Sequence, residues 1–206
     1  QDCHLGLDLA TKNDLACFNV TFKKIIDGKE NYFGFTYNFL NEEAVEDGRN
    51  SQYSGWERSG HITATDGNVT DHKLVEDRIR EIATQYNVKS VAYDDWQAQY
   101  LANNLTEDGL NMVNFKQNTA NMHEPMSSWE ALVLEGRYHH DGCPAMAWMT
   151  SNVVAHRNVS DHIYPRKEMA QNKIDGPISQ IMALGRWLTD RKQTNVYENR
   201  GLRTFD

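Results

Sequence analysis

The hydrophobic and polar positions of the first forty residues predict three β-strands. Apolar residues dominate 3–9 and 14–22, which are separated by the short polar turn 10–13, and 31–39 is rich in aromatic residues. Because the connections are short, we expect these strands to form an antiparallel meander. The next stretch, 41–60, is polar with Trp56 as its one large anchor, and we expect a helix or loop insertion that packs over the sheet edge.

The pattern of residues 71–86 changes to the spacing of an amphipathic helix, and Asp71 stands where an N-cap is expected. The apolar positions that recur at helical spacing are Leu74, Val75, Ile79, Ile82 and Ala83. Residues 88–96 then form a short apolar strand that ends in two acids. A helix through Leu105 and a strand over 110–115 follow, and this alternation predicts parallel pairing.

The last third of the chain predicts helices and one exposed connection. A helix is expected over 122–135, with Gly136 as its C-terminal stop. Residues 144–156 have mixed helical spacing, and 157–166 reads as an exposed hairpin or loop. The final helix, over 174–191, begins almost at Asp175.

This order of elements predicts an α/β protein with a ribonuclease H-like fold: three antiparallel strands, then parallel strands, flanked by helices. No repeat, low-complexity tract or clear linker divides residues 1–206, so one domain is expected. In such a fold the first strand lies beside the strand of residues 88–96. Asp8 and Asp94 would then be neighbours, and Asp175 would complete a site.

Asp8 interrupts an apolar strand, which is a costly place for a charge unless something binds it. We expect a divalent metal, because Mg²⁺ and Mn²⁺ prefer oxygen ligands and three converging carboxylates suit them. In a two-metal site, ions about 3.5–4 Å apart activate a water and stabilise the leaving oxygen at phosphorus. On this hypothesis Asp8 bridges two ions, Asp94 binds one and Asp175 binds the other.

Each acid also has an alternative structural interpretation. Asp8 would be stable as a buried acid if backbone amides bound it. Asp175 would be favoured by the macrodipole at any helix N-terminus. Asp94 and Asp95 are adjacent on a strand and point to opposite sides, so only one is expected at the site and the other is expected to cap a helix.

Five segments in order resemble the C-terminal nuclease domain of the large terminase subunit of tailed bacteriophages and prophages. They are GLDLATKNDLACF, VAYDDWQAQYLANNL, HHDGCPAMAWMTSNV, YPRK and NKIDGPISQIMALGRWL. The resemblance implies a metal-dependent endonuclease that cuts concatemeric viral double-stranded DNA during packaging. It assigns the acids of three motifs to Asp8, Asp94 and Asp175. Asp95 stands where related sequences often have proline, and Cys143 replaces the usual Asn, which leaves the role of its loop unassigned.

The resemblance also implies a larger context. Full-length members carry an N-terminal packaging ATPase, and we expect this chain, which starts at Gln1 and has no GxxxxGK[ST] phosphate loop, to be a C-terminal fragment. The implied partners are the terminase small subunit and the portal protein. The implied location is the cytoplasm of an infected or lysogenic bacterium, and no apolar run approaches the roughly 20 residues that span a membrane.

Composition modifies this picture in two ways. The net charge of −8 argues against a generic nucleic-acid binder, although a metal nuclease needs acids and a neighbouring domain can hold phosphates. Cys3, Cys17 and Cys143 are an odd number without CxxC spacing, so we expect buried thiols rather than disulfides or a zinc knuckle.

Secondary candidates surround the three acids. His139 and His140 precede Asp141, and a histidine beside a metal binds an ion or moves a proton, although most such histidines are surface residues. Scattered polar residues at the expected rim are candidates for phosphate contacts or ordinary solvated side chains: Lys12, Asn13, Lys116, Gln117, Arg166, Lys167 and Lys173.

Three other functions compete with the terminase interpretation. Actin-like sugar kinases and ATPases share an acid in the first strand, but they need a second Gly-rich phosphate loop and a longer two-lobed chain. Junction resolvases and integrase-type nucleases share the predicted fold and chemistry. A non-catalytic module that binds a packaging partner would lack the shared metal site.

Overall fold

A mixed β-sheet forms the centre of the computed structural model, which describes residues 1–10, 14–47 and 50–199, without the side chains of residues 96–97 and 193–199. The sheet strands are β1 (Asp2–Asp8), β2 (Ala16–Ile26), β3 (Lys29–Asn41), β4 (Thr63–Thr65), β5 (Asn87–Tyr93), β6 (Met112–Asn114) and β7 (Tyr138–His140). Their order is β4-β3-β2-β1-β5-β6, and β7 also pairs with β3.

The pairing confirms the predicted meander and the parallel addition to it. β1 pairs antiparallel with β2, and β2 with β3, whereas β5 pairs in parallel with both β1 and β6. Leu7 lies opposite Tyr93, and Tyr93 opposite Asn114. The carboxyl ends of β1, β5 and β6 therefore lie together at one end of the sheet.

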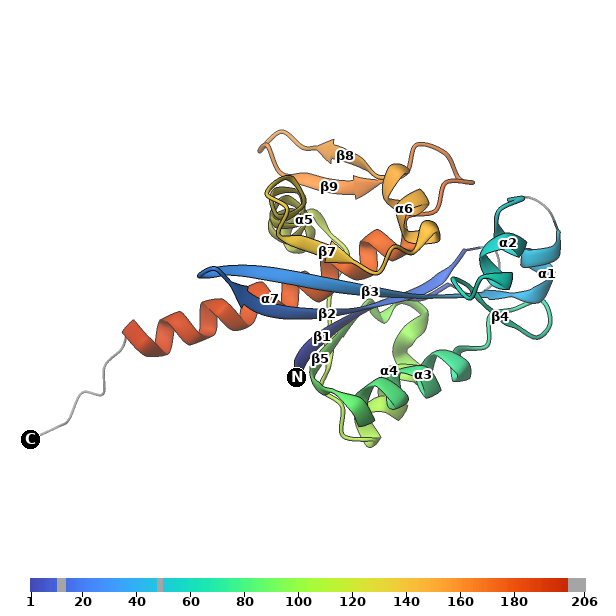
Figure 1. Cartoon of the computed structure of the whole chain (residues 1–206), viewed down its shortest axis with the longest axis horizontal. Helices are drawn as coiled ribbons and strands as arrows, with labels where there is room; N and C mark the ends of the chain where they lie inside the picture. Colours follow the sequence, from blue (N-terminus) through green and yellow to red (C-terminus); the bar gives the residue numbers. More distant parts are fainter. Residues whose placement is uncertain (11–13, 48–49, 200–206) are drawn as a thin grey trace, which may run out of the picture.

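Helices cover both faces of the sheet (Figure 1). They are α1 (Glu42–Glu46), α2 (Tyr53–Arg58), α3 (His72–Gln85), α4 (Asp95–Glu107), α5 (Thr119–Leu134), α6 (Pro144–Ser151) and α7 (Asp175–Asn199). Helices α3 and α4 lie on one face, and α5, α6 and α7 lie on the other. Two core clusters, one on each face, match this layering.

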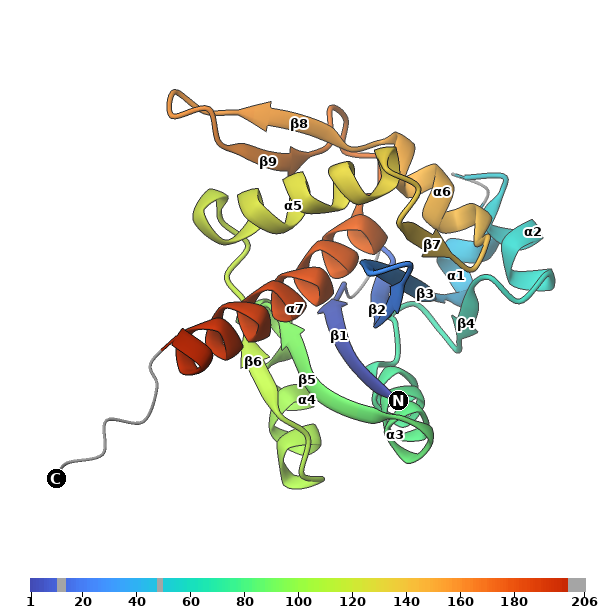
Figure 2. The same ribbon diagram turned by 60° about the vertical axis from the view of Figure 1, so that its left-hand side comes forward.

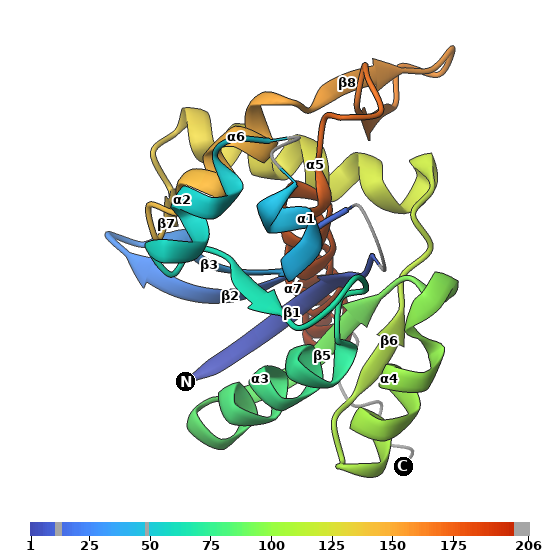
Figure 3. The same ribbon diagram turned by 90° about the vertical axis from the view of Figure 1, so that its right-hand side faces the viewer.

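The insertion predicted over 41–60 consists of α1 and α2, which lie next to α6 (Figure 3). Trp56 anchors it as expected, with its ring 5.6 Å from that of Trp148. The helix predicted over 71–86 is α3, and the Asp71 side chain accepts a hydrogen bond from the Lys73 amide at 2.8 Å.

One residue of the predicted buried face of α3 was placed wrongly. Leu74 is 41% exposed, whereas Val75, Ile79 and Ile82 are buried. The buried stripe also includes Glu76, which lies 3.0 Å from the Arg80 guanidinium and accepts a hydrogen bond from Asn104 at 3.1 Å. Because its charge is paired, Glu76 can occupy the buried face of α3, which Leu74 was expected to share. A pattern of apolar residues alone does not reveal such a buried acid.

The remaining elements differ from prediction mainly in length. The three-residue strands β4 and β7 were not predicted, because they are too short to show periodicity. Helix α5 begins three residues earlier than expected, at Thr119, and α7 extends to Asn199. The hairpin or loop expected over 157–166 is a hairpin, but it begins earlier: β8 (Val154–Arg157) pairs antiparallel with β9 (Ile163–Arg166). The helical spacing expected over 144–156 is therefore wrong beyond Ser151, where α6 ends; β8 is exposed along its whole length and its pairing with β9 defines it, so no buried periodicity marks the change.

Side chains along β1 point alternately to the two faces of the sheet, and this alternation determines which residues face α7. Leu5 and Leu7 belong to the core beneath α3 and α4, so Gly6 and Asp8 point to the opposite face. A Cβ atom added to Gly6 would lie 1.9 Å from the backbone oxygen of Ser179 in α7. The backbone of α7 therefore lies directly on the backbone of β1.

Buried polar contacts fix the first turn of α7 on the sheet. Asn19 of β2 donates its side-chain amide to the Gly176 carbonyl at 2.8 Å and to the Ser179 hydroxyl at 2.6 Å. The Asn19 oxygen accepts a hydrogen bond from the Thr36 hydroxyl at 2.7 Å. Asn19 and Ser179 are fully buried, so these bonds define where α7 begins relative to β1 and β2.

We predict that Gly6→Ala destabilises the protein by about 3 kcal/mol or more, because the new methyl group has no room against α7. Urea denaturation measures this change. Gly55→Ala is the matched control: Gly55 lies in α2 with no heavy atom within 4 Å of an added Cβ, so we expect unchanged stability or a gain of up to about 1 kcal/mol. Equal urea midpoints for Gly6→Ala and Gly55→Ala would contradict the close packing of β1 against α7.

Candidate active site

Three predicted site residues lie where a strand or helix begins or ends. Asp8 is the last residue of β1, Asp94 directly follows β5, and Asp175 is the first residue of α7. Figure 2 shows the beginning of α7 at the end of the sheet where β1 and β5 end. The tertiary structure therefore brings residues 8, 94 and 175 to one region.

Gln117 links two of these carboxylates. Its side-chain amide donates to Asp8 Oδ1 at 2.9 Å, and its backbone N–H donates to Asp94 Oδ2 at 3.3 Å. The hydroxyl of Tyr164, in β9, donates to the Gln117 carbonyl at 3.1 Å. The segment after β6, which contains the phosphate-contact candidate Gln117, is thus held between the β8–β9 hairpin and the acids.

The electrostatics show that the acids interact. Burial raises the pKa of Asp8 well above its usual value, and the charge of Asp175 raises it further; the hydrogen bond from Gln117 opposes this rise, and the charges of Asp94 and Asp14 add to it. Carboxylates that raise one another's pKa are costly to keep ionised together. A cation at this place would remove that cost.

Asp175 also has a raised pKa, and one of its carboxylate oxygens lacks a hydrogen-bond partner among the described residues. Burial and then the charge of Asp14 raise the pKa of Asp175 to about 6, against a backbone hydrogen bond and the charges of Lys167 and Lys173. Its Oδ2 atom is buried and has no hydrogen-bond partner among the residues that the structure describes. A buried polar atom without a partner lowers the stability of the folded protein unless a ligand binds it.

Sequence reasoning missed a fourth acid, Asp14, which lies just before β2 and forms an ion pair with Lys173. Lys173 is only 8% exposed, and its carbonyl accepts a hydrogen bond from Asn152 at 3.0 Å. Lys173, one of the candidates for a phosphate contact, neutralises Asp14 in the structure. The available signal was the position of Asp14 two residues before β2, whose residue Cys17 pairs with Asp8.

Two of the secondary candidates lie in structural contacts instead. His139 stacks on Phe33 with ring centroids 4.6 Å apart, and its Nε2 lies 3.1 Å from Asn31 Oδ1. His140 accepts a hydrogen bond from the Gly142 amide at 3.0 Å. These contacts are with β3 and with the loop after β7, and none involves the acids.

Asp95 has the helix-terminal position expected for one member of the acidic pair. It is exposed in the first turn of α4 and accepts a hydrogen bond from Asn114 at 2.9 Å, a bond that is the largest cause of its lowered pKa. Lys12 and Asn13 lie outside the described residues. All three cysteines are buried and free, as predicted.

The acids share one region without forming a compact ligand shell. Within the described ranges, no three His, Cys, Asp or Glu side chains are arranged closely enough to hold a metal ion. Asp8 and Asp94 instead satisfy part of their hydrogen-bonding capacity through Gln117. Binding of an ion by all three acids would therefore require side-chain adjustment.

Comparison with known proteins identifies related chains. A family model described as "Terminase large subunit, endonuclease domain" matches residues 1–191. The chain is 33% identical over 218 aligned positions to Protein YmfN of Escherichia coli strain K12, covering 100% of this chain and 48% of that protein. It is 28% identical over 186 residues to the terminase large subunit of Enterobacteria phage HK97, covering 88% and 36%.

Solved structures show the same architecture. The crystal structure of the HK97 large terminase matches with a TM-score of 0.79 and 25% identity, over 90% of this chain and 39% of that chain. The large terminase nuclease of thermophilic phage G20c matches with a TM-score of 0.57 and 14% identity, over 88% and 80%. These likenesses confirm the predicted ribonuclease H-like fold.

The present chain spans about half or less of the length of its curated relatives. Across the described helices, none combines the length and the apolar character needed to cross a membrane.

We predict that Asp175→Asn stabilises the metal-free protein at pH 8. The folded-state pKa of about 6 exceeds the ordinary value of 3.8, so the native state binds more protons between these pH values and its stability falls as the pH rises through them. Thermal denaturation at pH 8 should show a gain of about 1–2 kcal/mol after allowance for solvent screening, vanishing near pH 4.

The control for this measurement is Asp95→Asn. The pKa of Asp95 is lowered rather than raised, so loss of its charge should give no gain in stability at pH 8. Equal or larger stabilisation by Asp95→Asn would show that relief of general negative charge, and not the local environment of Asp175, explains the result.

Proposed function

Because the chain belongs to the terminase large subunit endonuclease domain family, we propose that it is a metal-dependent endonuclease that cuts concatemeric viral double-stranded DNA during genome packaging. The observation that carries this proposal is the meeting of Asp8, Asp94 and Asp175 at one end of the sheet. A buried, unpartnered carboxylate oxygen on Asp175 supports it.

The residues present fit a hard divalent cation. Carboxylate oxygens are the preferred ligands of Mg²⁺ and Mn²⁺, and both Asp8 and Asp175 lie where burial and neighbouring charge disfavour ionisation without a counter-charge. The G20c terminase nuclease has a crystal structure with bound magnesium, which makes Mg²⁺ the first ion to test here.

We propose that this site would hold two ions: Asp94 would bind one, Asp175 would bind the other, and Asp8 would contribute to both. When bound, such a pair supplies an activated water and stabilisation of the leaving oxygen in a phosphodiester hydrolysis. Gln117 positions Asp8 and Asp94 through its two hydrogen bonds, and Lys173 balances the charge of Asp14. The first turn of α7, fixed by Asn19, positions Asp175.

Membership of this family suggests the binding partners and the cellular location of the full-length protein. We propose that the terminase small subunit and the portal protein are partners of the full-length protein, in the cytoplasm of an infected or lysogenic bacterium. With a net charge of −8, this chain is expected to bind DNA weakly by itself, because phosphate contacts supply most non-specific affinity.

We predict that purified protein nicks and linearises plasmid DNA with Mg²⁺ or Mn²⁺ but not with EDTA. Asp8→Asn, Asp94→Asn and Asp175→Asn should each reduce cleavage by at least about 100-fold, because each removes a charged ligand. The control is Asp66→Asn, an exposed acid in the loop after β4, which should cleave normally. Normal cleavage by any of the three site variants would remove that residue from the site.

A second prediction concerns metal binding without DNA. Mg²⁺ or Mn²⁺ should raise the thermal midpoint of the wild-type protein in a concentration-dependent way, because a ligand that binds only the folded state stabilises it. The shift should be lost in Asp8→Asn and retained in Asp66→Asn. No shift in the wild type would count against the proposed metal site, and the absence of both the shift and cleavage would favour the non-catalytic module.

A further inference from the structure

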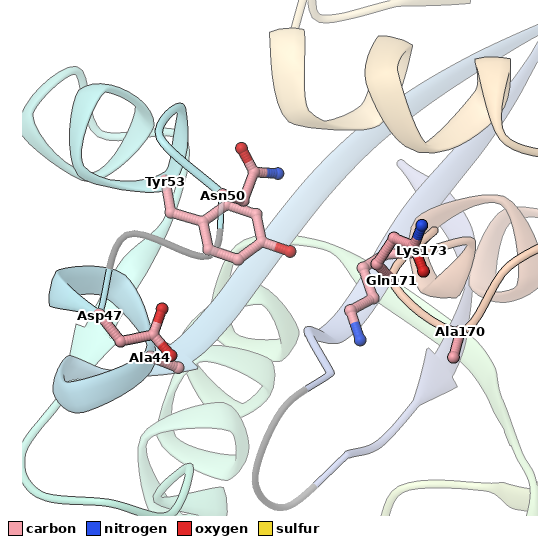
Figure 4. Close-up of a pocket in the computed structure, with 7 residues that line it drawn as sticks. All are labelled: Ala44, Asp47, Asn50, Tyr53, Ala170, Gln171 and Lys173. Atoms are coloured by element: carbon pink, nitrogen blue, oxygen red, sulfur yellow. The ribbon is translucent and has the colours of Figure 1, made fainter.

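A pocket of about 350 Å³ lies between the α1–α2 segment and the loop that leads into α7 (Figure 4). Its walls include Asp47, Asn50 and Tyr53 on one side and Ala170, Gln171 and Lys173 on the other. Figure 4 shows the Tyr53 hydroxyl directed toward the wall that carries Lys173. None of the roles assigned above uses this pocket.

The pocket adjoins the acids of the candidate active site. Lys173, in its wall, forms the ion pair with Asp14. Burial raises the pKa of Tyr53, and the charges of Asp175 and Asp14 add to that rise. The pocket is therefore a neighbour of the carboxylates through Lys173 and Asp14.

Two of the lining side chains are held in place by the core. Tyr53 is 5% exposed, and its ring lies 6.0 Å from that of Trp56 and 6.1 Å from that of Trp148. Lys173 is 8% exposed, and its ammonium group is held by the ion pair with Asp14. Preformed walls with a few polar groups are typical of small-ligand sites in this range of volumes.

The lining chemistry distinguishes between possible ligands. Lys173 and Tyr53 supply hydrogen-bond donors, the amides of Asn50 and Gln171 supply donors and acceptors, and Asp47 supplies a carboxylate. A phosphate group alone would be repelled by that carboxylate. A nucleobase has flat faces that suit the apolar Ala44 and Ala170, and its edge carries both donors and acceptors that match the Tyr53 hydroxyl and the two amides.

We propose that this pocket binds one unstacked nucleobase of the DNA strand that is cut, next to the phosphodiester at the acids. The inference rests on the proposed nuclease function, because it requires a DNA strand at Asp8, Asp94 and Asp175. Enzymes that do chemistry on a base move single nucleotides out of the stack into such pockets, which shows that a pocket of this kind can hold one base. Base contacts here compensate for the few phosphate contacts that a chain of net charge −8 makes.

The first experiment measures binding without metal and without cleavage. Assigned amide NMR spectra of the full chain in EDTA are recorded during titration with each of the four deoxynucleosides, and separately with deoxyribose 5-phosphate and inorganic phosphate. We expect saturable shifts at pocket residues with at least one deoxynucleoside. No saturable shift, or equal shifts with inorganic phosphate alone, would overturn the nucleobase assignment.

Matched variants localise the binding. Ala170→Phe fills the pocket from an exposed position, and we expect it to weaken nucleoside binding at least about tenfold. Ala131→Phe makes the same change on the exposed surface of α5 and should bind like the wild type. The spectra of both variants also report whether they remain folded. Equal binding by Ala170→Phe and the wild type would place the nucleoside elsewhere and reject the proposal.

The second experiment uses cleavage of a short duplex whose cut position has been mapped. A single abasic nucleotide is moved through the positions around the cut, and we expect kcat/KM to fall about tenfold at one flanking position. Ala170→Phe should lower cleavage of the intact duplex and lose that position dependence. Uniform cleavage of the whole series would overturn the proposal. Nucleoside binding without cleavage under any metal would retain the pocket assignment and reject the nuclease function.

Discussion

The direct contact between the backbones of β1 and α7 is the constraint on which the rest of this structure depends. Any side chain at Gly6 would meet the Ser179 carbonyl, so the strand and helix approach each other as closely as two backbones can. That approach lets the first residue of α7 lie beside the last residue of β1. Without it, Asp175 would be separated from Asp8 by a layer of side chains.

The polar contacts at the same interface explain why α7 has one position on the sheet. Hydrophobic packing between α7 and β1 is non-directional and would tolerate a shift along the strand. Buried hydrogen bonds from Asn19 to Gly176 and Ser179 do not tolerate such a shift, because each would leave an unsatisfied group. The specificity of the site therefore comes from a few polar residues that are distant from it in sequence.

The acids themselves are a source of instability that the fold carries at one end of its sheet. Burial, and then the charges of neighbouring acids, raises the pKa of Asp8 and Asp175, and Gln117 and Lys173 oppose only part of this rise. The same neighbourhood contains the pocket beside Tyr53, whose walls are already fixed by the aromatic residues of α2 and α6. A cluster of carboxylates beside a pocket lined by both donors and acceptors suits a substrate that carries both a phosphate and a base.

The sequence by itself determined the order of the main elements, the ribonuclease H-like topology and the segments that carry the three acids, because periodicity, caps and an acid inside an apolar strand are local signals. It did not determine the helix phase that exposes Leu74, the strands β4 and β7, or the ion pair of Asp14 with Lys173. Those features depend on contacts between distant segments. Tertiary structure alone decided that Gln117 joins Asp8 to Asp94, and that Tyr53 and Lys173 face one pocket, since no local pattern encodes the distance between residues so far apart in the chain.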